Sequence, residues 1–173
     1  MIGKRMQDAI NEQIRHETFS AYLYLAMAAD FHAKGLAGMA QWMKVQAQEE
    51  IGHAMRFFDH LTERGGHIEL LAIEQPQQTW DSALAAFEAA YGHEQLITGK
   101  INDLVEIARE ENDNASWIML QWFVTEQVEE EASVSTVVDM LKLIGDSGHG
   151  VLMADRELGQ RVFAPASAAA DAG

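Results

Sequence analysis

Apolar residues recur every three or four positions along most of this chain, which is the spacing that lines one face of an α-helix. Gly35, Gly65 and Gly145 each follow such a run and are suited to ending a helix. Asp81 and Ser82 precede another run and can cap its first turn. The pattern therefore predicts four long helices, at about residues 4–33, 38–64, 83–111 and 115–144.

The remaining segments predict how these helices are connected. Residues 67–79 contain Pro76, show no helical period and are too long for a tight turn, so we expect them to cross from the second helix to the third. A shorter periodic run at about 147–162 predicts a fifth helix, and the small residues of 164–173 predict a disordered tail. The expected fold is all-α: residues 1–163 form a four-helix bundle with one long crossover and a short fifth C-terminal helix. An extended coiled coil fits less well, because the stripes are broad and the helices are alike in length.

Polar residues interrupt every apolar stripe close to its middle. The positions that each stripe would continue through are held by Glu17 in the first helix, Glu50 and His53 in the second, Glu94 in the third, and Gln127 and Glu130 in the fourth. The midpoints of packed helices of equal length lie at one level of a bundle. We therefore expect four carboxylates to meet inside the core. The predicted inward face of a single helix could be off by one position, which would place its acid in solvent. All four helices would have to be mispredicted in this way, at matching depth, for the layer not to form.

The composition of the chain limits the kinds of partner that the protein can bind. The chain carries 12 Lys and Arg against 27 Asp and Glu, a formal net charge of −15, which disfavours nucleic acid and anionic membranes and attracts cations. It contains no cysteine, which excludes a disulfide framework and thiolate metal sites. There is no long uncharged apolar stretch, and the first residues lack a signal-peptide core. A soluble, cytoplasmic protein is expected.

Four buried carboxylates need a counter-charge. Burying an ionised carboxylate costs several kcal/mol, against a total stability of roughly 5–15 kcal/mol for a domain. Two divalent cations would balance Glu17, Glu50, Glu94 and Glu130, and neutral His53 would add a further ligand. Oxygen ligands with one imidazole favour iron or manganese over zinc. The predicted chemistry is metal oxidation or oxygen activation at a dinuclear centre.

Four stretches of the chain resemble the bacterial non-haem ferritins in order and spacing, over nearly the whole length: NEQIRHETFSAYLY, AQEEIGHAMRFFDHL, HEQLITGKIN and LQWFVTEQVEEE. The ligand layout of ferritin-like di-iron bundles is a general one. The resemblance implies a first iron held by Glu17, Glu50 and His53, a second held by Glu94 and Glu130, Glu50 as the bridge, and Gln127 close by. It also implies that Glu49, Glu126 and Glu129 form a third iron site, with Tyr24 and Trp122 beside the centre.

The resemblance further implies a function. Such a protein oxidises Fe(II) with O2 or peroxide and stores a ferric mineral in a hollow shell of 24 subunits, whose fourfold axes the fifth helix lines. Ile51 and Gly52 stand where bacterioferritin has its haem-ligating methionine, so no haem is expected. The absence of cysteine argues against a rubrerythrin, and the absence of Lys and Arg from residues 164–173 argues against the DNA-binding mini-ferritins.

Two other functions remain open at the level of sequence. A di-iron oxygenase acting on an organic substrate would need a substrate pocket beside the metals and a small oligomer. A passive shell subunit would lack a working centre, and the complete ligand set argues against it.

Overall fold

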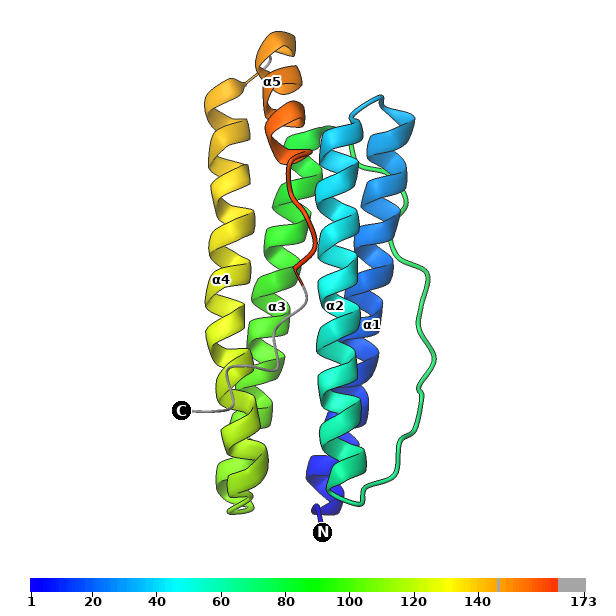
Figure 1. Cartoon of the computed structure of the whole chain (residues 1–173), viewed down its shortest axis with the longest axis vertical. Coiled ribbons are helices and arrows are strands. Elements are labelled where there is room, and N and C mark those ends of the chain that lie inside the picture. Colours follow the sequence, from blue (N-terminus) through cyan, green and yellow to red (C-terminus); the bar gives the residue numbers. More distant parts are fainter. Residues whose placement is uncertain (146, 165–173) are drawn as a thin grey trace.

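The computed structural model describes residues 1–145 and 147–164, and within them the chain forms five α-helices and no strand (Figure 1). The helices are α1 (Lys4–Ala33), α2 (Ala37–Glu63), α3 (Ala83–Glu110), α4 (Asn114–Ile144) and α5 (Gly148–Leu158). The first four lie side by side as a long bundle, and α5 sits across one end. The predicted all-α bundle is confirmed, and its four long helices begin and end within one residue of the predicted positions.

The fifth helix ends earlier than predicted, at Leu158 instead of about Val162. Beyond it, the amides of Gln160 and Arg161 bond carbonyls only three residues back, which is the pattern of a tightened final turn. The side chain of Arg161 then bonds to α2 and draws the chain away from the helix axis. The predicted disordered tail lies almost entirely in 165–173, outside the described residues.

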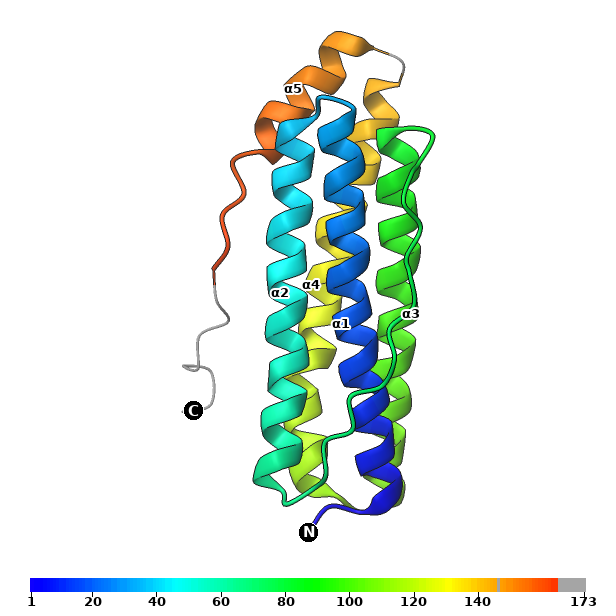
Figure 2. The same ribbon diagram turned by 90° about the vertical axis from the view of Figure 1, so that its right-hand side faces the viewer.

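The long connection between α2 and α3 runs the length of the bundle along the outside of α1 (Figure 2). Asn11 fastens its start, because its side chain donates to the His67 carbonyl at 3.0 Å and accepts from the Glu69 amide at 3.1 Å. Asp30 fastens its end by accepting from the Trp80 amide at 3.2 Å. The predicted crossover is present, and it makes α2 and α3 run in the same direction.

The apolar core is divided into two clusters, one at each end of the bundle. The cluster near α5 includes Tyr24, Phe31 and Phe87, and the cluster at the other end includes Phe57 and Phe123, whose rings stack with centroids 4.0 Å apart. The six polar interruptions of the stripes lie between the two clusters in sequence on every helix. No helix in the described part of the chain combines the length and the apolar character needed to cross a membrane.

Gly38 is required where α5 packs on the start of α2. A Cβ added there would lie 1.7 Å from the backbone oxygen of Asp155, whose side chain also accepts from the Met39 amide at 2.8 Å. We expect Gly38→Ala to push α5 off α2 and to destabilise the fold by about 1–3 kcal/mol, despite the better helix propensity of alanine. Chemical unfolding measures this. Gly99→Ala is the control, because a Cβ there meets nothing within 4 Å and should leave stability unchanged or raised. Equal effects of the two substitutions would contradict the prediction.

Candidate metal centre

A polar layer crosses the middle of the bundle, between the two apolar clusters. Its members come from all four long helices and are each at least nine-tenths buried: Glu17, Glu50, His53, Glu94, Gln127 and Glu130. They are the residues at which the sequence pattern predicted the stripes to be interrupted. The expected meeting of the four helices' polar positions is therefore present in the structure. The role of these side chains as ligands stays a prediction.

Two groups of side chains in this layer are close enough to share a cation. Glu17, Glu50 and His53 each offer a ligand atom, and these atoms lie within 4.8 Å of one another. His53, Glu126 and Glu130 form a second group by the same measure. The first group has the composition expected for the first metal. The second differs from expectation, because it contains Glu126, which the resemblance assigns to a third site, and not Glu94.

Glu94 is engaged by two hydrogen-bond donors instead. The Tyr24 hydroxyl donates to its Oε1, and the Gln127 side-chain amide lies 3.3 Å from its Oε2. Burial raises the pKa of Tyr24 well above its ordinary value of 10, as do the charges of Glu94 and Glu50, so the hydroxyl keeps its proton and remains a donor. Tyr24 thus contacts the polar layer through Glu94, and its place beside a metal centre stays a prediction.

The carboxyl groups of the layer hold their protons tightly in the metal-free protein. Burial raises the pKa of Glu17, Glu50, Glu94 and Glu130, because a buried carboxylate loses its hydration. Mutual repulsion adds to the effect: Glu94 raises the pKa of Glu50, and Glu130 helps raise that of Glu94, which reaches about 8. The layer therefore carries less negative charge at neutral pH than its composition suggests, unless a cation replaces the protons.

His53 joins the two groups. Burial lowers its pKa, but the charge of Glu50 and the contact with Glu126 outweigh burial, so that the His53 pKa is raised well above its ordinary value. Its Nδ1 lies 3.3 Å from a Glu50 oxygen and its Nε2 lies 3.8 Å from a Glu126 oxygen. The Trp122 ring packs edge-on against the imidazole with centroids 5.5 Å apart, which puts this tryptophan beside the layer as expected.

Two buried polar atoms of the first group have no hydrogen-bond partner. They are Oε2 of Glu17 and Nδ1 of His53, whose 3.3 Å contact with Glu50 lacks the geometry of a hydrogen bond. An unsatisfied buried polar atom costs about 1–3 kcal/mol, so orphaned atoms of this kind call for a specific explanation. Both are lone-pair donors to a metal when the groups are deprotonated. A cation held between Glu17, Glu50 and His53 would satisfy both, and the donor set fits a hard or borderline divalent metal.

Two glutamines on α1 and α2 support the carboxylates. The Gln13 amide donates to Glu17 at 2.8 Å, and the Gln46 amide donates to Glu130 at 2.6 Å and to Glu50 at 3.2 Å. Each glutamine lies four residues before the acid on its own helix, one turn away on the same face. The sequence analysis did not identify either of them. That spacing was the available signal, since hydrogen-bonded neighbours commonly orient metal ligands.

The three acids assigned by resemblance to a third iron site are not gathered into one group. Glu126 lies with His53 and Glu130, whereas Glu129 is exposed to solvent on α4. Glu49 is partly buried and forms an ion pair with Arg161. Burial raises the pKa of Glu49, and the charge of Arg161 opposes that rise.

Comparison with known proteins gives a consistent result. A family model described as "Ferritin-like domain" matches residues 7–144. A bacterial non-heme ferritin of Bacteroides fragilis is 42% identical over 161 residues, covering 93% of this chain and 100% of that protein. Its counterpart in Campylobacter jejuni is 40% identical over 156 residues, covering 90% of this chain and 93% of that one. The crystal structure of an open pore ferritin from Archaeoglobus fulgidus superimposes with a TM-score of 0.93 at 50% identity, covering 94% of this chain and 100% of that chain.

Proposed function

The chain belongs to the ferritin family, and on that premise we propose that it oxidises Fe(II) in its polar layer and stores the ferric product as a mineral inside a hollow shell of its own copies. The observation that carries the proposal is the layer itself, in which four carboxyl groups and an imidazole are buried together without a protein counter-charge for all of them. Such a layer is unfavourable for stability alone and is suited to binding cations.

We assign the ligands from the contacts of each side chain. Glu17, Glu50 and His53 would hold the first Fe(II), and the two orphaned atoms would become ligands. Glu130 would hold the second with Glu50 between the two ions. Glu94 would turn its Oε2 to the second ion by giving up the long contact with Gln127, while Tyr24 keeps hold of Oε1. Gln127 then lies next to the second ion.

The reaction needs little covalent chemistry from the protein. Two Fe(II) ions are the substrate, and each gives up one electron. O2 accepts the pair with two protons to form hydrogen peroxide, or hydrogen peroxide accepts them with two protons to form two water molecules. The carboxyl groups release their own protons as the metal binds, since metal ligands must be deprotonated. The stacked Phe57 and Phe123 rings bound the layer on one side and keep bulk water from it.

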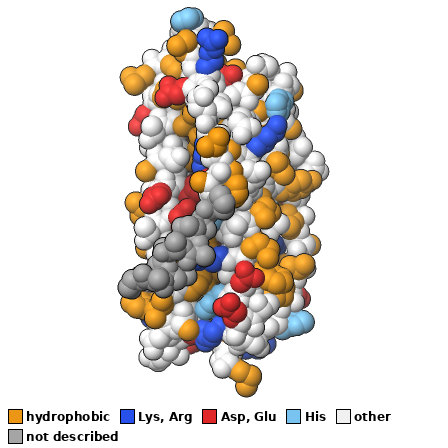
Figure 3. All heavy atoms as spheres, viewed as in Figure 1, with side chains coloured by type: hydrophobic (Ala, Val, Ile, Leu, Met, Phe, Trp, Pro, Cys, Tyr) orange, Lys and Arg blue, Asp and Glu red, His pale blue; other side chains and the backbone are white. Residues whose placement is uncertain are grey.

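Assembly into a shell is supported by the apolar side chains that the single subunit leaves in solvent. Leu143, Leu152 and Met153 are all more than half exposed, on the end of α4 and on α5. Exposed hydrophobic side chains also lie over much of the face in Figure 3. Surfaces of this kind mark contacts between subunits. We propose a shell of 24 subunits in the cytoplasm, without haem and without nucleic-acid or membrane partners.

Aerobic addition of Fe(II) to the metal-free protein tests the proposal. We expect a ferric species to form faster than in protein-free buffer, and iron in large excess over three ions per subunit to stay soluble with the protein. Native mass spectrometry should show one large closed oligomer. Oxidation no faster than in buffer, or a small oligomer that retains only two or three ions per subunit, would contradict storage. The second result would favour a di-iron oxygenase.

A further inference from the structure

The segment that follows α5 continues in the same direction, down the bundle on the α2 side (Figures 1 and 2). Its anchor is Arg161. The guanidinium carbon lies 4.3 Å from the centroid of the Trp42 ring, Nη1 donates to Oε1 of Gln46 at 2.7 Å, and Nη2 donates to Oε2 of Glu49. The three partners are spaced four and three residues apart, so they form one stripe on α2. One arginine thus ties the end of the described chain to the helix that supplies Glu50 and His53.

Gln46 connects this arginine to the polar layer. Its side-chain oxygen, Oε1, accepts a hydrogen bond from Arg161, while its side-chain nitrogen, Nε2, donates to Glu130 and Glu50. The contact with Arg161 therefore fixes which end of the Gln46 amide faces the carboxylates, since an amide turned around would present an oxygen to them. Arg161 is a positioning residue for the layer, although it lies outside it.

Arg161 also forms an ion pair with Glu49, which lies on the outer side of the polar layer. The charges of Glu130 and Glu126 act on Glu49, so that this carboxylate lies in the field of the second group of ligands. A cation approaching that group from solvent would find the Glu49 oxygen already bound to a guanidinium. On the face shown in Figure 3, further acidic side chains gather over α4, beside the path of this segment. They would attract cations to the same place.

We propose that Arg161 is a tethered counter-ion that competes with a divalent cation for Glu49, so that a third metal ion binds only when the segment after α5 moves away from α2. This inference rests on the proposed function. The hold on Arg161 consists of one ion pair with both side chains about one-fifth exposed, one further hydrogen bond and one stacked ring. Partly exposed ion pairs and stacked rings of this kind are weak. A divalent cation can therefore displace the arginine, whose own charge is permanent.

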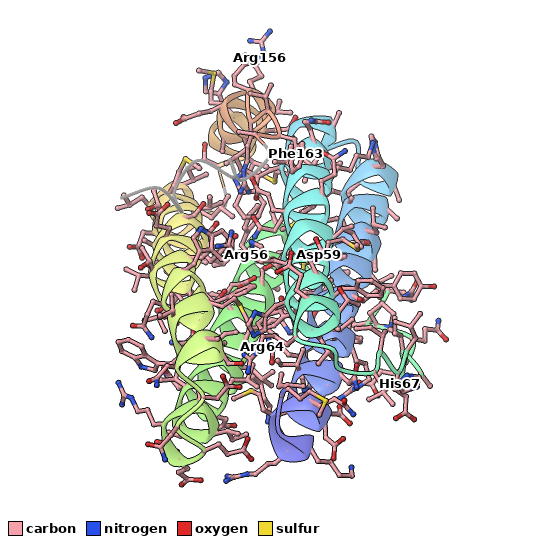
Figure 4. All side chains as sticks on the ribbon, turned by 60° about the horizontal axis from the view of Figure 1, so that its bottom comes forward. Arg56, Asp59, Arg64, His67, Arg156 and Phe163 are labelled. Atoms are coloured by element: carbon pink, nitrogen blue, oxygen red, sulfur yellow. The ribbon has the colours of Figure 1, made fainter. Side chains whose placement is uncertain are left out.

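Arg161→Gln tests the competition directly, with anaerobic titration of Fe(II) followed by calorimetry. We expect the third equivalent per subunit to bind about 5–10-fold more tightly than in the unaltered protein. The first two should bind no more tightly than before, because Gln46 loses the partner that orients its amide. Arg156→Gln is the matched control. It removes the same charge from the same region, but Arg156 points away from the bundle (Figure 4), and the third equivalent should be unaffected. Native mass should show the same oligomer for all three proteins.

Hydrogen exchange supplies a measurement that does not depend on oxidation. In the unaltered protein, exchange of the Gln160 and Arg161 amides, which bond the Glu157 and Leu158 carbonyls, should stay slow with two equivalents of Fe(II) and rise with the third. In Arg161→Gln it should be fast from the start. In a Glu49→Gln background, Arg161→Gln should no longer alter metal affinity, because both competitors have lost the carboxylate.

The outcomes separate this inference from the function it rests on. If two equivalents bind in every protein but the third is unchanged or weaker in Arg161→Gln, the competition is wrong and the proposed centre stands. If the first two equivalents of Fe(II) fail to bind in the unaltered protein, the proposed function is wrong, and so is the proposed competition between Arg161 and a cation. Slow exchange of the Gln160 and Arg161 amides at three equivalents would also overturn the proposed competition.

Discussion

Glu50→Ala should lower the rate of Fe(II) oxidation at least about 100-fold and should reduce tight metal binding from two ions per subunit to one or none. Even outer neighbours of metal ligands change activity or affinity by about 10–100-fold, so a shared ligand should have at least that effect. Glu50 connects several members of the layer: it shares a group with Glu17 and His53, accepts from Gln46, and interacts with the charge of Glu94. Stopped-flow absorbance of the ferric product and anaerobic calorimetry measure the two effects.

A control on the same helix separates a ligand from a general loss of charge. Glu63 is exposed at the end of α2, and Glu63→Ala should leave both measurements unchanged. A conservative variant separates a ligand from a structural residue. Glu50→Gln keeps the size of the side chain, and because the raised pKa of Glu50 leaves its carboxyl group protonated in the metal-free protein, the stability of that protein should change little. Oxidation should therefore be lost in Glu50→Gln while the metal-free protein keeps its stability. Full oxidation in Glu50→Ala would exclude the assigned centre.

The sequence predicted the polar layer because two regularities act together. Apolar residues repeat with the period of a helix, and helices of equal length bring their midpoints to one level, so an acid such as Glu94 in the middle of a stripe must be buried. Neither step depends on the details of side-chain packing. For the same reason, the helix ends were predicted closely where a local signal exists, as with Ser82, whose side chain accepts from the Ala85 amide at 3.0 Å.

What the sequence did not reveal depends on contacts between distant segments. Nothing near Arg161 in the chain indicates that it would bond to Glu49, which lies 112 residues earlier. Nor does spacing show that Tyr24 and Gln127 would bind the two oxygens of Glu94. Rotamers and the lateral packing of helices determine such pairs, whereas the period of a stripe determines only which face a residue lies on.

The metal-free protein should lose stability as the pH rises from 6.5 to 8.5. A group whose pKa is raised by folding stabilises the fold fully below its unfolded pKa, and that stability is lost as the pH rises through the folded pKa. Glu94, raised from 4.5 to about 8, and His53, raised well above 6.5, both act in this direction. His93 acts in the opposite direction, because burial lowers its pKa to about 4, but its effect is complete once the pH exceeds 6.5. Calorimetric unfolding across this window measures the slope.

Bound metal should reverse this dependence. A divalent cation competes with the protons of the layer, so it binds more tightly as the pH rises. At about 100 times its dissociation constant, a ligand adds about 2.7 kcal/mol of stability, and for a chain of this length each kcal/mol raises the melting temperature by roughly 2–4 °C. Anaerobic Fe(II) should therefore raise the melting temperature by about 5–10 °C at pH 8 and by clearly less at pH 6.5.

Two substitutions on α3 test whether the pH dependence of stability comes from the polar layer. Glu94→Gln removes a titrating group whose folded pKa lies inside the window, so the metal-free protein should show a flatter stability profile between pH 6.5 and 8.5. Glu106→Gln changes the same residue type at an exposed position of the same helix and should keep the original slope. If the profile of the unaltered metal-free protein were already flat, the layer would not be storing protons that a metal must displace. Cation binding would then have to be driven by the orphaned atoms of Glu17 and His53 alone.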